Sequence, residues 1–138
     1  MDKNPSLYIN LIVENLSTAT EFYKTIGFAQ NLQFSSEKGS AMVWKDEFAV
    51  MLLTYDFAQE FLPNHKKIST KENTSALYAI PFSSREEVDI FFETALKAGA
   101  KKTIETYDYG SMYGRDFEDL DGHIWEAFWM DPTGIPQA

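Results

Sequence analysis

Glu126 is the residue with the clearest capacity for chemistry, because it stands in an otherwise apolar stretch near the end of the chain. Apart from its leading histidine, the rest of the stretch His123-Ile-Trp-Glu-Ala-Phe-Trp-Met130 is hydrophobic. Side chains alternate between the two faces of a strand, so Ile124, Glu126 and Phe128 would share one face. Both faces are apolar enough to be buried, and a buried carboxylate needs a partner, a metal, a ligand or a proton.

A turn precedes this strand, because Asp121-Gly122 suits the positive φ values of a type I′ hairpin. A two-residue loop there would place Phe117 opposite Glu126. Arg115 would then lie opposite Phe128, on the face of Glu126. Glu126 is therefore either a pocket carboxylate, which binds a cationic or hydroxylated group or acts as a base, or the internal partner of Arg115. A register shift of one residue would turn Arg115 to the other face.

The composition limits the possible partners. The chain has 138 residues, of which 44% are hydrophobic and 15% aromatic, and this predicts one domain with a substantial core. The 21 acidic and 12 basic residues give a net charge of −9, which disfavours nucleic acid and anionic membranes as partners. Without cysteine, disulfides, thiolate metal sites and cysteine nucleophiles are excluded. The chain has no apolar run long enough for a membrane span and no signal peptide, so we expect a cytoplasmic protein.

The apolar pattern indicates the order βαβββ, twice. In the first copy a strand at 7–13 precedes a helix capped by Asn15 or Ser17, and strands follow at 30–35, 41–44 and 48–54. In the second copy a strand at 76–82 precedes a helix capped by Ser83 or Ser84, and strands follow at 102–107, 113–118 and 123–130. These elements predict a single domain over residues 1–138, with module one at about 5–55, a linker or flap at about 56–75 and module two at about 76–131.

Three features resemble the vicinal oxygen chelate superfamily, which holds the glyoxalases, bleomycin-resistance proteins and extradiol dioxygenases. They are the paired βαβββ units, the opening Tyr8-Ile-Asn-Leu-Ile-Val-Glu-Asn-Leu16 with Phe22-Tyr-Lys-Thr-Ile-Gly-Phe28, and the closing Asp119-Leu-Asp-Gly-His-Ile-Trp-Glu126. The resemblance covers nearly the whole chain. It implies an α+β fold in which the sheets of two βαβββ modules curl around a cleft, completed as a homodimer.

The resemblance also implies four inward-facing metal ligands, one from the first and one from the last strand of each module. Tyr8, Leu52 and Leu77 fall at three of these positions, and only Glu126 matches. One carboxylate and a phenol cannot form the cage of N and O donors that a divalent ion needs, so we predict no metal and no cofactor. Asn10 is a polar residue in an apolar strand, and it bonds either to neighbouring backbone or to a ligand.

These observations predict a metal-free, homodimeric protein of the bleomycin-resistance or glyoxalase-like type, which binds a small amphipathic or cationic molecule in an acidic, aromatic cleft. An alternative is a glyoxalase-like lyase or a dioxygenase in which Glu126 is a metal ligand or general base. A third interpretation is a vestigial cleft. Glu126 is the one catalytic candidate, and the expected ligand-binding residues are Tyr8, Asn10, Leu52, Leu77, Tyr113, Arg115, Glu126 and Phe128.

Overall fold

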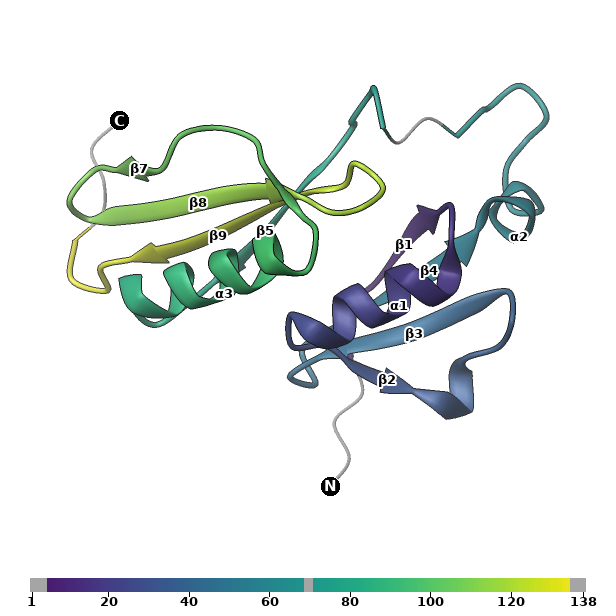
Figure 1. Ribbon diagram of the computed structural model, residues 1–138, viewed down its shortest axis with the longest axis horizontal. Coiled ribbons are helices and arrows are strands. Elements are labelled where there is room, and N and C mark those ends of the chain that lie inside the picture. The colour runs from purple at the N-terminus through teal and green to yellow at the C-terminus, as the bar shows by residue number, and fades with distance from the viewer. Residues whose placement is uncertain (1–4, 69–70, 135–138) are drawn as a thin grey trace. The chain divides into compact units, whose positions relative to one another are not determined.

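The chain folds into two compact units, Met1–Thr70 and Lys71–Ala138 (Figure 1). The computed structural model describes residues 5–68 and 71–134. Each unit contains one βαβββ module built on a mixed sheet, which confirms the predicted α+β fold. In these described residues, no helix has the length and apolar character that crossing a membrane requires.

The first unit is a four-stranded sheet with a helix packed on one face, as Figure 1 shows. Its elements are β1 (Tyr8–Val13), α1 (Leu16–Thr25), β2 (Ala29–Asn31), the 3-10 helix η1 (Leu32–Phe34), β3 (Gly39–Trp44), β4 (Phe48–Thr54) and α2 (Tyr55–Gln59). The strand order is β1-β4-β3-β2, with β1 parallel to β4. The core lies between α1 and the sheet, where Phe22, Tyr23 and Leu11 are almost fully buried.

The second unit repeats this plan. Its elements are β5 (Leu77–Pro81), α3 (Arg85–Lys97), β6 (Lys101–Lys102), β7 (Tyr107–Asp108), β8 (Met112–Glu118) and β9 (Ile124–Met130). The strand order is β5-β9-β8-β6, and β7 also pairs with β8. Trp125 and Phe117 from the sheet and Phe92 from α3 are buried to at least 99%, so they form the centre of this core.

The helices begin where the sequence predicts. The Asn15 side chain accepts a hydrogen bond from the Thr18 amide at 3.0 Å and caps α1. Ser84 caps α3 by accepting from the Glu87 amide at 3.2 Å, and the Glu87 carboxylate accepts from the Ser83 amide at 2.8 Å. These bonds satisfy backbone donors that have no partner within the helix, so each start is determined locally.

Three predicted elements differ from the observed ones. The strand predicted at 30–35 ends at Asn31, because the Asn31 side chain accepts from the Gln33 amide at 3.0 Å and begins η1. The predicted linker begins with the helix α2. The strand predicted at 102–107 is divided into β6 and β7. Lys102 pairs with Phe117 and Tyr107 with Gly114, so this side of the ladder holds two extra residues that cannot pair.

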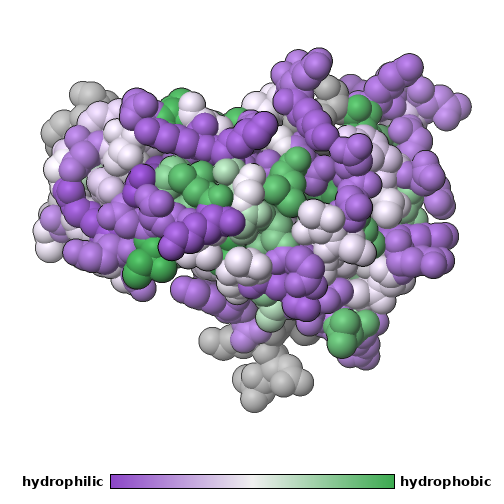
Figure 2. All heavy atoms as spheres, viewed as in Figure 1, coloured by the Kyte–Doolittle hydropathy of each residue, from purple (hydrophilic) through white to green (hydrophobic). Residues whose placement is uncertain are grey.

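The net charge of −9 predicts a surface that is rich in charged side chains. On the face shown in Figure 2, hydrophilic residues predominate and hydrophobic residues form small separate groups. Isolated apolar side chains on a surface are normal in a folded protein.

Candidate functional site

The sheet of the second unit has one face against α3 and an opposite face, which we call the distal face. Paired residues of neighbouring strands point to the same side. The register pairs Ala79 with Glu126 and Asp116 with Glu126, so these three side chains share the distal face. Leu77, Pro81, Ile124, Phe128 and Gly114 lie on it too. The predicted common face of Ile124, Glu126 and Phe128 is thus confirmed.

The hairpin before β9 has a longer loop than predicted. The Asp119 amide donates to the His123 carbonyl at 2.8 Å, and the Gly122 amide donates to the Asp119 carbonyl at 3.3 Å. Gly122 has a φ of 90°, the left-handed value that completes a three-residue hairpin loop. The Asp119 carboxylate also accepts from the Asp121 and His123 amides, both at 2.9 Å. One residue more in the loop shifts the register by one and exchanges the faces of β8.

Arg115 is therefore not the partner of Glu126, and the alternative of an internal Arg115–Glu126 pair is wrong. Its guanidinium lies on the α3 side, where it donates to Asp89 at 3.1 Å and forms an ion pair with Glu93 at 3.1 Å. The guanidinium carbon is 4.0 Å from the centroid of the Phe92 ring, a cation–π contact. Arg115 attaches β8 to α3 and leaves the charge of Glu126 without compensation from this residue.

Tyr113 also lies on the α3 side, so the structure separates it from Glu126. Its hydroxyl donates to Asp89 at 2.6 Å. The Arg85 guanidinium lies 5.2 Å from the ring centroids of both Tyr113 and Trp129, and it donates to the Asp108 carboxylate at 2.6 and 3.1 Å. These contacts connect the start of α3 to β7 and β8, which is a structural role.

Asp116, which the sequence analysis missed, is the carboxyl group beside Glu126. It is only 4% exposed, and the Tyr107 hydroxyl donates to its Oδ1 at 3.0 Å. Burial raises the pKa of Asp116 to about 6; the Tyr107 hydrogen bond opposes this rise, whereas the charge of Glu126 and a hydrogen bond between the two carboxyl groups add to it. Asp116 can therefore hold a proton at slightly acidic pH, and the ionised pair can bind a cation.

Tyr107 lies across the distal face because residue 114 is a glycine. A Cβ at position 114 would overlap the Tyr107 ring. Burial, followed by the charge of Asp116, raises the pKa of the Tyr107 hydroxyl, which therefore stays a hydrogen-bond donor. A glycine inside a strand often marks the close approach of another group, so Gly114 was the sequence signal for this contact.

In the first unit, the register divides the predicted residues between the two faces. Asn10 pairs with Met51, and Leu11 pairs with Leu52. Leu52 thus lies on the α1 side, fully buried, so the inward-facing position predicted for it together with Tyr8 is wrong. Both faces of β4 are apolar, so alternation gave no signal there. Tyr8 and Asn10 share the opposite face, where Tyr8 is 51% exposed and the Asn10 amide has no side-chain partner among the described residues.

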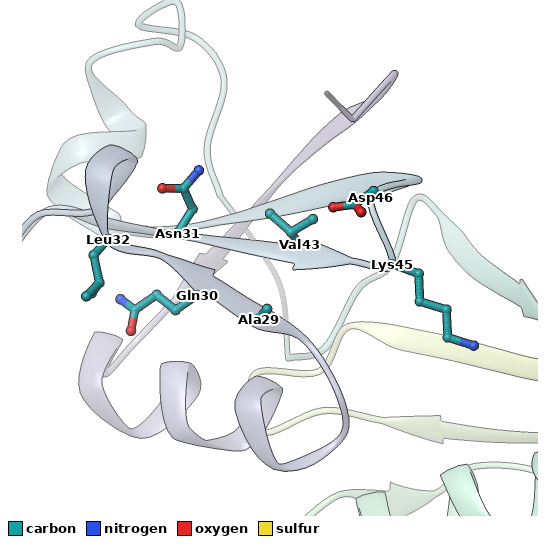
Figure 3. A pocket seen from close by; sticks show the side chains of 7 residues that line it. All are labelled: Ala29, Gln30, Asn31, Leu32, Val43, Lys45 and Asp46. Atoms are coloured by element: carbon teal, nitrogen blue, oxygen red, sulfur yellow. The ribbon is translucent and has the colours of Figure 1, made fainter. Parts of the chain in front are cut away.

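A hollow of about 500 Å³ lies on β2 and the β3–β4 turn of the first unit (Figure 3). Asn31, Val43 and Asp46 project from one side of the ribbon there. The other lining residues are Ala29, Gln30, Leu32 and Lys45. Lys45 and Asp46 have opposite charges that cancel, and no residue predicted for the site lines this hollow.

The donor set does not fit the metal that the fold resemblance implies. The register puts Met51, a thioether, on the face of Tyr8 where a carboxylate would be needed. Leu77 has no donor atom in its side chain, so Glu126 is the one strong oxygen ligand of the four positions. Within residues 5–68 and 71–134, no three His, Asp or Glu side chains are grouped so that they could hold a metal ion.

Comparison with known proteins agrees with this architecture. The Glyoxalase/Bleomycin resistance protein/Dioxygenase superfamily matches residues 6–127. The chain belongs to this superfamily. No curated protein matches this superfamily member.

Solved structures of similar fold cover almost the whole of this superfamily member. A hypothetical protein from S. aureus is 26% identical, with a TM-score of 0.76 over 90% of this chain and 92% of that chain. A glyoxalase/bleomycin resistance protein/dioxygenase family enzyme from Burkholderia phytofirmans PsJN is 16% identical, with a TM-score of 0.76 over 89% of this chain and 96% of that chain. A fosfomycin resistance protein from Listeria monocytogenes is 23% identical, with a TM-score of 0.68 over 94% of each chain. These likenesses support the fold.

Proposed function

We propose that the protein binds a small cationic or amphipathic molecule through Glu126 and Asp116 on the distal face. The observation that carries this proposal is the pair of carboxyl groups, which lie side by side as cross-strand partners of β8 and β9. Within residues 5–68 and 71–134, the side chains that shift the pKa of Asp116 are Tyr107 and Glu126, and neither is cationic. A ligand ammonium or guanidinium group against the pair would remove the repulsion between the carboxylates and replace part of their lost hydration.

Apolar side chains around the pair support an amphipathic ligand. Leu77 is 56% exposed, Ala79 and Pro81 are exposed, and Phe128 is partly buried, all on the distal face. Apolar and aromatic walls with a few polar groups are the usual composition of small-molecule sites. The charged part of the ligand would contact Glu126 and its apolar part would cover Leu77 and Phe128.

We propose further that binding needs no metal, because the ligand positions of the fold carry Tyr8, Met51 and Leu77 beside Glu126. Elemental analysis of the purified protein checks this point. We expect far less than one equivalent of zinc, nickel, iron or manganese. One equivalent that is lost in a Glu126→Gln variant would contradict the proposal.

Binding of a cationic glycopeptide such as bleomycin, followed by calorimetry, tests the function. We expect saturable binding, weakened in Glu126→Gln by about 1.5–3 kcal/mol, the contribution of a hydrogen bond to a charged group. Glu72→Gln is the matched control, because it removes the same charge from an exposed loop of the same unit and should leave binding unchanged. Equal affinity of wild type and Glu126→Gln, with both folded, would refute a role of Glu126 in binding.

A further inference from the structure

A second cavity in the first unit carries a site of different chemistry. It has a volume of about 380 Å³ and lies at the edge of the interface between α1 and the strands β2 and β3. Its polar lining residues include Ser17, Thr20, Glu21, Gln30, Glu37 and Ser40. Gln30 pairs with Met42, and Ser40 pairs with Leu52, so both project to the α1 side of the sheet. We call this cavity the α1–β3 pocket.

The floor of the α1–β3 pocket is a buried pair of hydroxyl groups with a defined direction of hydrogen bonding. The Thr20 hydroxyl donates to the Leu16 carbonyl at 2.7 Å and lies 2.8 Å from the Ser40 hydroxyl. A hydroxyl has one hydrogen, so Ser40 must donate to Thr20. Ser40 is 3% exposed and has no other side-chain partner among the described residues, so its oxygen keeps free acceptor capacity.

The rim of the pocket adds polar groups that the described residues leave without a side-chain partner. These are the Ser17 hydroxyl, the Gln30 amide and the Glu37 carboxylate. The Glu21 carboxylate forms an ion pair with Lys24, with 3.6 Å between Oε1 and Nζ. This pair is exposed to solvent, so it contributes little to stability. Among the residues that the structure describes, no lysine or arginine lines the pocket, so acceptors and negative charge exceed donors.

We propose that the α1–β3 pocket binds a small polyhydroxylated compound that carries an ammonium group, of the amino-sugar class. The volume lies within the range of about 300–1,000 Å³ that is usual for small-molecule sites. The ammonium group is attracted to Glu37 and Glu21, ligand hydroxyls donate to Ser40, and the Gln30 amide both donates and accepts. An anionic sugar is repelled by the two carboxylates. This site lies in the first unit and does not depend on Glu126.

Titrations with glucosamine, glucose and glucuronate, followed by amide chemical shifts at slightly acidic pH, test the inference. These sugars share a ring size and differ in charge. We expect glucosamine to shift the amide signals of residues 16–21, 30 and 36–40. Glucose should bind with about tenfold lower affinity, and glucuronate should cause no shifts. Identical shifts from all three sugars, or no shifts from glucosamine at tens of millimolar, would overturn the proposal.

Variants separate recognition from adventitious contact. Glu37→Gln should weaken the binding of glucosamine at least about fivefold and leave the binding of glucose unchanged, because the substitution removes the charge and keeps the size of the side chain. Gln30→Ala should weaken both sugars. Glu60→Gln, which removes an exposed carboxylate of the same unit outside the pocket, is the control and should change nothing. Glucosamine affinity that is unaltered in Glu37→Gln and in Gln30→Ala, with both variants folded, would refute the site.

Discussion

Replacement of Asp116 by asparagine should stabilise the protein at neutral pH and have no effect in acid. Asp116 is 4% exposed and its folded-state pKa is raised from 3.8 to about 6. At about 1.36 kcal/mol for each pH unit, ionised Asp116 costs the folded state about 3 kcal/mol relative to the unfolded chain. Asp116→Asn removes this cost, and the asparagine oxygen can still accept from the Tyr107 hydroxyl.

The sign of the pH dependence follows from proton binding. Between pH of about 4 and 6 the folded state binds more protons than the unfolded state, so the contribution of Asp116 to stability falls as pH rises. The contribution is complete below about pH 3.8 and is lost as pH rises through about 6, the folded-state pKa. The difference in unfolding free energy between Asp116→Asn and wild type should therefore rise from near zero at about pH 3 to about 3 kcal/mol at about pH 7.5.

Urea denaturation across this pH range measures the difference, in which the contributions of other groups cancel. Asp108→Asn is a control of opposite sign, because hydrogen bonds from Arg85, and next from the Gly110 amide, lower the pKa of Asp108. That variant should be less stable than wild type at neutral pH, and its deficit should disappear as pH falls. A difference for Asp116→Asn that does not change with pH, or one that is destabilising at every pH, would refute the raised pKa of Asp116.

Three other predictions concern the same elements. Tyr107→Phe and Gly114→Ala should both raise the pKa of Asp116, because each removes the hydrogen bond from the Tyr107 hydroxyl to Asp116. NMR titration of the Asp116 carboxyl group measures this pKa. A titration midpoint that is the same as in wild type would contradict the hydrogen bond. Arg115→Met should lower the free energy of unfolding by about 1–2 kcal/mol, because it removes the ion pairs with Asp89 and Glu93 and the cation–π contact with Phe92. The same variant should bind bleomycin as tightly as wild type. A loss of affinity without a loss of stability would place Arg115 at the ligand instead. Sedimentation at micromolar concentration should give a homodimer, because exposed apolar residues such as Tyr8 and Leu77 lie on sheet faces opposite the helices. The dimer interface should bury more than about 1,000 Å². Sedimentation that shows only a monomer would contradict this prediction.

Several features of the molecule are determined by short stretches of sequence. Asn15 and Ser84 begin the two helices through bonds to amides three residues ahead, and alternation in β9 is enough to group Ile124, Glu126 and Phe128. Such features depend on neighbours in the chain, so local propensity and periodicity predict them. The order of these elements and the two end motifs were sufficient to predict the superfamily.

The residues that surround Glu126 were decided by tertiary structure. Asp121-Gly122 reads locally as a two-residue turn, but the bonds made by Asp119 favour a three-residue loop, and this moves every side chain of β8 to the opposite face. As a result Asp116 replaces Arg115 as the neighbour on the distal face. The turn residues Asp121-Gly122 alone do not show that Asp119 closes a longer loop, and the partner strands that complete the distal face come from distant parts of the sequence. The sequence by itself therefore determined that a carboxylate stands in the last strand, and the fold decided that a second carboxyl group lies beside it.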